Sequence, residues 1–335
     1  MKRRCCPQWI RFRHASAIVA ALIGIVPHTL CVNRVAAELA KPELVVPGPT
    51  DGARFNAPGG IALNPNRGEV ILANTKEHRI EIYTLGGRLL TRFTHRVRGK
   101  DGNLVDGLPR SVAVAGASRL LVADSYAPYV DVVDYRGRSV GELITSIPPD
   151  AGGPASVAVA RDGKILVAGS GSHGRIYLFA SDFTPIGSWG EAGSQPGHLN
   201  GIAAIAELPG GNIAVACMQT ELAVQIFTPA GEYVRGFGSH EIGPGNFSLP
   251  SGIATTTDGR IWVGDELRQI VQVFDSSGTF LGALGGGGSA PGAFQYPSAL
   301  ATDGATRLAV AERVGGRFQL FTILGRGDDP ESERP

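Results

Sequence analysis

Short apolar segments that begin with a small residue recur at six places along the chain. Each is centred on Ile, Val or Leu and ends in Ala, and the central residues lie 45 to 51 residues apart. The six segments are Gly60-Ile61-Ala62, Ser111-Val112-Ala113, Ser156-Val157-Ala158, Gly201-Ile202-Ala203, Gly252-Ile253-Ala254 and Ala299-Leu300-Ala301. A period of this length indicates a repeat architecture.

Each repeat continues with the same order of polar and apolar positions. A polar turn leads to a second apolar segment, such as Arg307 to Ala311, and a loop then leads to an alternating segment, such as Arg317 to Phe321. A turn that contains Gly precedes a fourth segment, such as Thr279 to Leu284. Short apolar or alternating runs between turn residues predict strands. We therefore expect one four-stranded antiparallel sheet per repeat.

Six such sheets predict an all-β fold, a six-bladed β-propeller. A lone four-stranded sheet cannot bury both faces, whereas sheets stacked around an axis bury them and leave only short edges. The sixth repeat has no fourth strand, but Glu43 to Pro47 is strand-like and precedes the first repeat. We expect Leu44-Val45-Val46 to pair with Phe318 to Phe321 and so to close the ring by completing the last blade.

These signatures resemble the NHL repeat family over residues 43 to 325. The best matches are the segment from Phe247 to Ala254, followed by Val263-Gly264-Asp265 and Val273-Phe274-Asp275, and the pair Ala73-Asn74 with His78-Arg79-Ile80. The resemblance implies a six-bladed propeller. For function it implies less, because such propellers include protein-binding, RNA-binding and enzymatic members.

The composition agrees with strands and turns. Of 335 residues, 47 are Gly and 22 are Pro, while 43% are hydrophobic and 18% charged. These values exclude a disordered, collagenous or coiled-coil chain.

The N-terminal segment 1–37 predicts a cleaved signal peptide. Lys2, Arg3 and Arg4 belong to a basic region without acidic residues, and the apolar run from Ala17 to Val26 is too short to span a bilayer. Cleavage is expected after Ala37, with Ala40 as the alternative. A short linker, 38–42, would then precede the propeller, 43–325, and a polar tail, 326–335. We expect an exported protein, periplasmic or extracellular, with no membrane span in the mature chain.

Removal of the leader changes the charge and the cysteine content. The leader holds six Lys or Arg and no acidic residue, so 25 basic and 30 acidic residues remain, a net charge of −5. Nucleic-acid binding depends on clustered positive charge, and we do not expect it. Cys5, Cys6 and Cys31 leave with the leader, so Cys217 has no disulfide partner and is expected to be a core residue.

The position just before each recurrent apolar segment should lie at one mouth of the propeller channel. These positions are Gly59, Arg110, Ala155, Asn200, Ser251 and Ser298. Arg110 and Asn200 are the candidates for ligand contact. A related amidating lyase would carry zinc-binding His at such Pro-His sites, but this chain has Pro109-Arg110 and Pro297-Ser298. We expect no metal, no other cofactor and no catalytic residue.

The loops between the second and third strands add candidates for a binding face. Tyr and Arg are enriched at binding hot spots, and the candidates here are His78, Tyr126, Tyr129, Arg268 and Arg313. Two polar pairs that recur at the same place, Asn74 with Arg79 and Glu312 with Arg317, are interpreted as structural. The histidines after the leader, which are His78, His95, His173, His198 and His240, lie in five different loops and are expected at the surface.

The sequence thus predicts an exported NHL-type propeller that serves as a non-catalytic binding scaffold for a protein or a small extracellular ligand. The alternative is a propeller enzyme, a metal-dependent lyase or a hydrolase, with Arg110 and Asn200 orienting an anionic substrate. The sequence leaves the identity of the ligand and the oligomeric state open.

Overall fold

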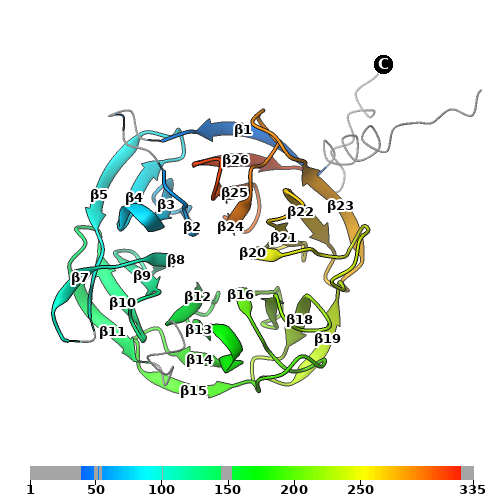
Figure 1. The fold of residues 1–335 in the computed structure, drawn as a ribbon, viewed down its shortest axis with the longest axis horizontal. Helices are drawn as coiled ribbons and strands as arrows, with labels where there is room; N and C mark the ends of the chain where they lie inside the picture. The colour runs from blue at the N-terminus through cyan, green and yellow to red at the C-terminus, as the bar shows by residue number, and fades with distance from the viewer. Residues whose placement is uncertain (1–38, 49–51, 53–54, 100, 145–152, 326–335) are drawn as a thin grey trace, which may run out of the picture.

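The computed structural model describes residues 39–48, 52, 55–99, 101–144 and 153–325. The expected signal peptide, 1–37, and the expected tail, 326–335, lie outside these residues. Six four-stranded antiparallel sheets stand in a ring around a central axis (Figure 1). The predicted six-bladed all-β propeller is therefore confirmed. No helix of the described residues is long and apolar enough to cross a membrane.

Each blade starts with its innermost strand and runs outward. Blade 1 comprises β2 (Gly60–Asn64), β3 (Glu69–Asn74), β4 (Arg79–Thr84) and β5 (Leu89–Thr94); blade 2 comprises β8 (Pro109–Ala115), β9 (Arg119–Asp124), β10 (Tyr129–Asp134) and β11 (Ser139–Ile144); blade 3 comprises β12 (Pro154–Val159), β13 (Ile165–Gly169), β14 (Ile176–Phe179) and β15 (Pro185–Trp189). Blade 4 comprises β16 (Ile202–Glu207), β17 (Ile213–Cys217), β18 (Val224–Phe227) and β19 (Tyr233–Phe237); blade 5 comprises β20 (Pro250–Thr255), β21 (Ile261–Asp265), β22 (Ile270–Phe274) and β23 (Phe280–Gly285).

Blade 6 combines both ends of the described chain. It comprises β24 (Pro297–Thr302), β25 (Arg307–Glu312), β26 (Arg317–Ile323) and, as its outer strand, β1 (Ala40–Val46). The predicted pairing of Leu44-Val45-Val46 with Phe318 to Phe321 is confirmed, and the register places Leu44 opposite Leu320 and Val46 opposite Phe318. The strand begins at Ala40, three residues before the expected start at Glu43.

The hydrophobic core lies between neighbouring blades. One cluster, for example, combines Val46 and Phe318 of blade 6 with Leu72 and Tyr83 of blade 1. The rings of Tyr83 and Phe318 meet edge to face with centroids 5.4 Å apart. Strands that are buried on both faces explain why the second segment of each repeat is apolar throughout.

Glycines allow the innermost strands of neighbouring blades to approach closely. A Cβ atom on Gly60 would lie 2.8 Å from Ser111 Cα, and one on Gly252 would lie 2.5 Å from Leu300 N. Contacts this short do not occur with a real side chain. Gly60 and Gly252 are therefore required by the packing of the channel wall.

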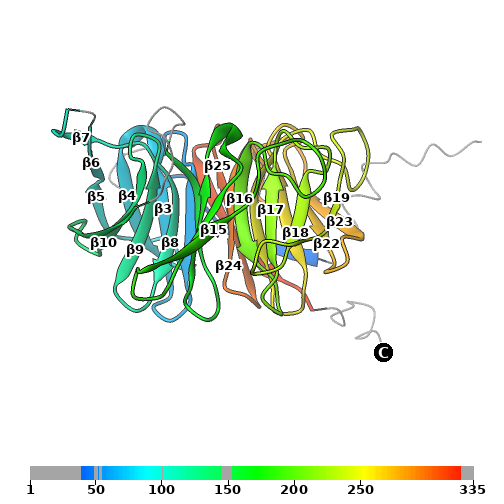
Figure 2. The ribbon, with the colours of Figure 1, turned by 90° about the horizontal axis from the view of Figure 1, so that it is seen from below.

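The polar insertion between blades 1 and 2 forms a hairpin that the sequence does not predict. Its strands β6 (Arg96–Arg98) and β7 (Leu104–Asp106) pair with each other at the outer edge of the ring (Figure 2). The hydroxyl of Tyr129 accepts a hydrogen bond from Arg98 N at 3.2 Å. This contact ties the hairpin to blade 2.

Candidate functional site

A cavity of about 720 Å³, here called the channel-mouth cavity, opens at one end of the central channel. It is formed by the loops that lead into the innermost strands and by the loops that follow the second strands. Its lining residues are Asn56, Ala57, Gly59, Thr75, Lys76, Arg110, Ser125, Ala155, Ala203, Met218, Leu249, Pro250, Ser251, Glu266, Ser298, Arg313 and Val314.

Most of the positions that the sequence predicts at the channel mouth, here called the rim positions, lie together at this cavity. Gly59, Arg110, Ala155, Ser251 and Ser298 line both the cavity and a narrower space of about 80 Å³ between the innermost strands. Of the described residues that line the narrower space, Arg110 alone is charged.

Asn200 is the rim candidate that does not line either space, because blade 4 contributes Ala203 there instead. The side-chain oxygen of Asn200 is buried and has no hydrogen-bond partner among the described residues. The left-handed backbone of Gly201, with φ of 61°, gives blade 4 a different approach to its innermost strand.

Hydroxyl groups at the rim hold neighbouring blades together. Ser251 Oγ donates a hydrogen bond to the carbonyl of Pro297 at 2.7 Å, and Ser298 Oγ donates to the carbonyl of Pro58 at 2.6 Å. Each bond joins one blade to the loop that leads into the next. The hydroxyl protons of both serines are thus already used within the ring.

Arg110 has no counterion at hydrogen-bond distance. No described residue accepts a hydrogen bond from its guanidinium, although that group is largely surrounded by protein. Burial lowers the pKa of Arg110 below the ordinary arginine value, and the positive charge of Arg313 lowers it further, while Asp124 opposes both effects. The pocket therefore holds a cation that its surroundings only partly compensate.

Arg313 differs from Arg110 because a carboxylate faces it. Its Nε lies 3.2 Å from Glu266 Oε1, in an ion pair where the Glu266 side chain is 11% exposed. Burial raises the pKa of Glu266, and the charge of Arg313 counteracts that rise. Lys76 adds a further exposed cation to the lining.

The other predicted loop candidates do not line the cavity. His78 Nδ1 lies 2.6 Å from the carbonyl of Gly107, and Arg268 donates to the carbonyls of Gly243 and Asn246. Tyr126 is 55% exposed and Tyr129 is 8% exposed. The structure thus brings Arg110 and Arg313 together and leaves these four side chains outside the cavity.

His95 departs from the surface position expected for a loop histidine. It is 2% exposed, its Nδ1 lies 3.0 Å from Asp124 Oδ2, and its Nε2 lies 3.2 Å from Asp131 Oδ2. Burial alone would lower the pKa of His95, but the hydrogen bonds and charges of the two carboxylates raise it to about 9. The expectation was wrong because His95, which lies between β5 and β6, contacts Asp124 of β9 and Asp131 of β10 and not solvent.

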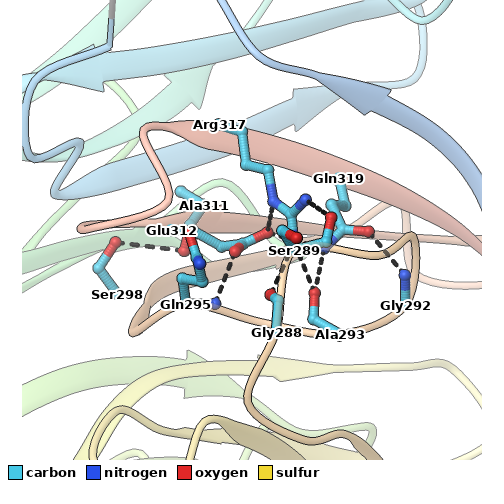
Figure 3. A network of polar contacts seen from close by, with 10 residues as sticks. All are labelled: Gly288, Ser289, Gly292, Ala293, Gln295, Ser298, Ala311, Glu312, Arg317 and Gln319. Atoms are coloured by element: carbon cyan, nitrogen blue, oxygen red, sulfur yellow. Dashed lines mark hydrogen bonds and ion pairs between the residues drawn. The ribbon is translucent and has the colours of Figure 1, made fainter.

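One of the two predicted structural pairs is present. Arg317 Nε donates to Glu312 Oε1 at 2.7 Å, and the same guanidinium donates to the backbone carbonyls of Ser289 and Ala293 (Figure 3). Gln319 donates to the same Glu312 oxygen at 2.7 Å, so three polar side chains hold the loop before β24 in place.

The second predicted pair has a different geometry. Asn74 donates its side-chain amide to Glu81 Oε1 at 3.0 Å, whereas Arg79 lies 4.0 Å from Glu77. The short 3-10 helix η1 (Thr75–Glu77) places Glu77 next to Arg79, which the repeat pattern does not reveal.

The opposite end of the channel contains a second cavity, of about 400 Å³, with Arg161, Glu207 and Asp303 in its lining. Glu207 accepts a hydrogen bond from Arg161 N at 2.7 Å, and its carboxylate lies 3.6 Å from the Arg161 guanidinium. Asp303 caps its own turn through Ala305 N and the Thr306 hydroxyl. Among the described residues, no group of three or more His, Cys, Asp or Glu could hold a metal ion.

Comparisons with known proteins identify the fold. No protein-family model matches the chain, and no curated protein matches it either. Among solved structures, the chain is similar to a Bacteroides thetaiotaomicron protein of unknown function, with 16% identity and a TM-score of 0.64 over 84% of this chain and 73% of that one.

Two further structures are similar over most of their own length. A streptogramin B lyase is 15% identical with a TM-score of 0.57, over 81% of this chain and 95% of that one. A structure named as a gluconolactonase is 15% identical with a TM-score of 0.60, over 86% of this chain and 94% of that one. Likenesses at this level of identity establish the six-bladed propeller fold alone.

Proposed function

We propose that this protein is an exported, NHL-type, non-catalytic binding scaffold whose ligand occupies the channel-mouth cavity. The observation that carries the proposal is the cavity itself, about 720 Å³ in volume and lined by loops of several blades. Small-molecule sites commonly have volumes of roughly 300–1,000 Å³. A ring of rigid sheets holds these loops at fixed distances, as recognition without rearrangement requires.

The charged groups of the cavity favour recognition over proton transfer. General acid–base catalysis needs a group that faces the substrate and is free to exchange a proton. Glu266, the one acidic residue among those that line the cavity, is engaged by Arg313. Arg110 stays charged at every physiological pH, so it can orient a ligand but does not serve as a proton carrier.

The test compares ligands retained by the full-length protein and by two variants. Val314→Trp fills the mouth from a side chain that is 65% exposed, and Val140→Trp adds the same bulk at a 47% exposed position of β11, away from the cavity. Small molecules and proteins retained from cell-envelope extracts would be identified by mass spectrometry. We expect the ligand with the wild-type protein and Val140→Trp, and its loss with Val314→Trp.

Two results would contradict the proposal. Equal retention by Val314→Trp would move the binding site away from the cavity. Conversion of the retained molecule to a product by the wild-type protein, abolished in Val314→Trp, would favour a propeller enzyme such as a lyase or a hydrolase.

A further inference from the structure

The charge and the shape of the channel-mouth cavity indicate the chemistry of its ligand. We infer that the ligand presents a single carboxylate to Arg110 and an apolar portion to Met218, Leu249 and Val314. This inference rests on the proposed function, because it assigns the ligand class of the same cavity.

The position of Arg110 makes it the anchor of the site. It is the second residue of β8, and it lines both the cavity and the narrower space below. The equivalent positions in four of the other five blades carry the small residues Gly59, Ala155, Ser251 and Ser298, and Asn200 of blade 4 does not line the cavity. A guanidinium therefore projects alone from a wall of small residues, where a ligand group can approach it.

Two cations of the cavity lining have no counterion among the described residues, the exposed Lys76 at the mouth and the largely buried Arg110. Arg313 is matched by Glu266 at 3.2 Å. Asp124, the carboxylate that attracts Arg110 electrostatically, already accepts hydrogen bonds from Tyr126 N at 2.8 Å and from His95 at 3.0 Å. A partly buried charge without a hydrogen-bonded counterion is costly, and an anionic ligand would remove that cost.

The charge of the site favours a carboxylate over a phosphate dianion. A single planar guanidinium matches the two oxygens of a carboxylate in a bidentate pair. A dianion beside Arg110 would need further donors at that depth, but the Ser251 and Ser298 protons are committed to backbone carbonyls, and Lys76 is exposed at the mouth. Glu266 would also repel a second negative charge. One buried cation without a counterion favours one negative charge.

The apolar part of the ligand follows from the rest of the lining. Met218, Leu249 and Val314 line the mouth, while the space below it is only about 80 Å³. The carboxylate can therefore reach the narrow end beside Arg110, while the larger apolar part of the ligand stays in the mouth. Both a free organic acid and the C-terminal residue of a polypeptide have this chemistry.

The experiment is calorimetric titration of the full-length protein with four probes. Hexanoate represents a free acid, and an N-acetylated tripeptide ending in leucine represents a polypeptide terminus. The same tripeptide with an amidated C-terminus and inorganic phosphate are the comparison probes. We expect at least one carboxylate probe to bind, and neither the amide nor phosphate to bind. The carboxylate that binds more tightly identifies the source.

Variants assign the binding to Arg110. Arg110→Gln should weaken carboxylate binding by about 10- to 100-fold, because a hydrogen bond to a charged group is lost. Arg136→Gln removes the same charge from an exposed turn of blade 2 and should leave the affinity unchanged. Arg110→Lys keeps the positive charge but loses the planar pair of N–H donors, so it should bind the carboxylate more weakly than the wild-type protein does. This variant replaces Arg110→Gln if Arg110→Gln does not fold.

The inference is overturned if neither carboxylate binds, if phosphate or the amide binds as well, or if the Arg110 variants retain wild-type affinity. These failures are distinct from failure of the proposed function. If the carboxylates do not bind but Val314→Trp still abolishes retention of the native ligand, the cavity binds a ligand of another class. If Val314→Trp retains that ligand, the cavity is not the binding site.

Discussion

His95 Nδ1 lies 3.0 Å from Asp124 Oδ2, in a contact that joins the loop after blade 1 to the second strand of blade 2. Asp131 on β10 faces the other ring nitrogen at 3.2 Å. The imidazolium thus shares its charge between two buried carboxylates, one of which also acts electrostatically on Arg110. This arrangement makes a loop histidine part of the interior and links the ion pair to the wall of the cavity.

The first prediction concerns stability at alkaline pH. The pKa of His95 is raised to about 9 in the folded state, from about 6.5 in the unfolded chain. Its stabilising contribution is therefore complete below about pH 6.5 and is lost as the pH rises through about 9. We expect the free energy of unfolding to fall by roughly 3 kcal/mol over this window, as measured by urea denaturation at a series of pH values.

The control for this prediction is His95→Gln. The variant leaves two buried carboxylates without their shared cation, so it should lose about 3–5 kcal/mol at neutral pH. It should also lose most of the pH dependence above pH 6.5. If the slope persists in His95→Gln, another group is responsible for it.

The second prediction concerns the close approach of the innermost strands. Gly60→Ala would place Cβ 2.8 Å from Ser111 Cα, so the strands of blades 1 and 2 must separate. A loss of about 1–3 kcal/mol is expected. Gly187→Ala on β15 meets no atom within 4 Å and should be neutral or stabilising. Equal effects of the two substitutions in thermal unfolding would contradict this explanation.

The third prediction concerns Cys217. The thiol is fully buried, as expected for a core cysteine, and burial raises the pKa of Cys217 to about 12. Thiolate is the reactive form, so iodoacetamide should not modify this residue in the native protein. Peptide mapping by mass spectrometry should detect modification only after denaturation. Rapid labelling of the native protein would show that blade 4 opens locally.

The fourth prediction compares one repeat position in two blades. Arg317 donates to Glu312 and to backbone carbonyls of the preceding loop, whereas Arg79 lies 4.0 Å from Glu77 and is one-third exposed. Arg317→Met should therefore cost about 3–5 kcal/mol, because it leaves buried acceptors unpaired. Arg79→Met should cost less than about 1 kcal/mol. Urea denaturation of both variants measures the difference, and equal losses would mean that the network in blade 6 adds nothing.

The sequence predicts the blades well because each strand repeats the same local pattern. The six segments centred on Ile, Val or Leu locate β2, β8, β12, β16, β20 and β24, and the missing fourth strand of the last repeat locates β1 opposite β26. The segment Leu44-Val45-Val46 can be paired with Phe318 to Phe321 in advance because only one strand-like segment and one open edge remain. The period of the repeat and the number of strand-like segments are sufficient to predict this part of the fold.

The same reasoning does not predict the parts that depend on loops. The β6–β7 hairpin consists largely of polar residues, so its sequence lacks a strand pattern. The burial of His95 follows from its contacts with Asp124 and Asp131, which lie 29 and 36 residues further along the chain. Arg110 is found at the rim from its repeat position, but the partnership of Arg313 with Glu266 depends on side-chain directions that no spacing encodes. Asn200 does not line either space at the channel mouth, and the left-handed backbone of the adjacent Gly201 is not encoded in the repeat pattern.

Closure of the ring by β1 has a consequence for how the protein is made. Glu43 and Thr322, which contact each other in blade 6, are 279 residues apart in the chain. Strand β1 is made first and stays unpaired until β26, the last strand of the propeller, has been made. Such late, long-range pairing makes folding slow and leaves an unpaired strand that is prone to aggregation until the ring closes.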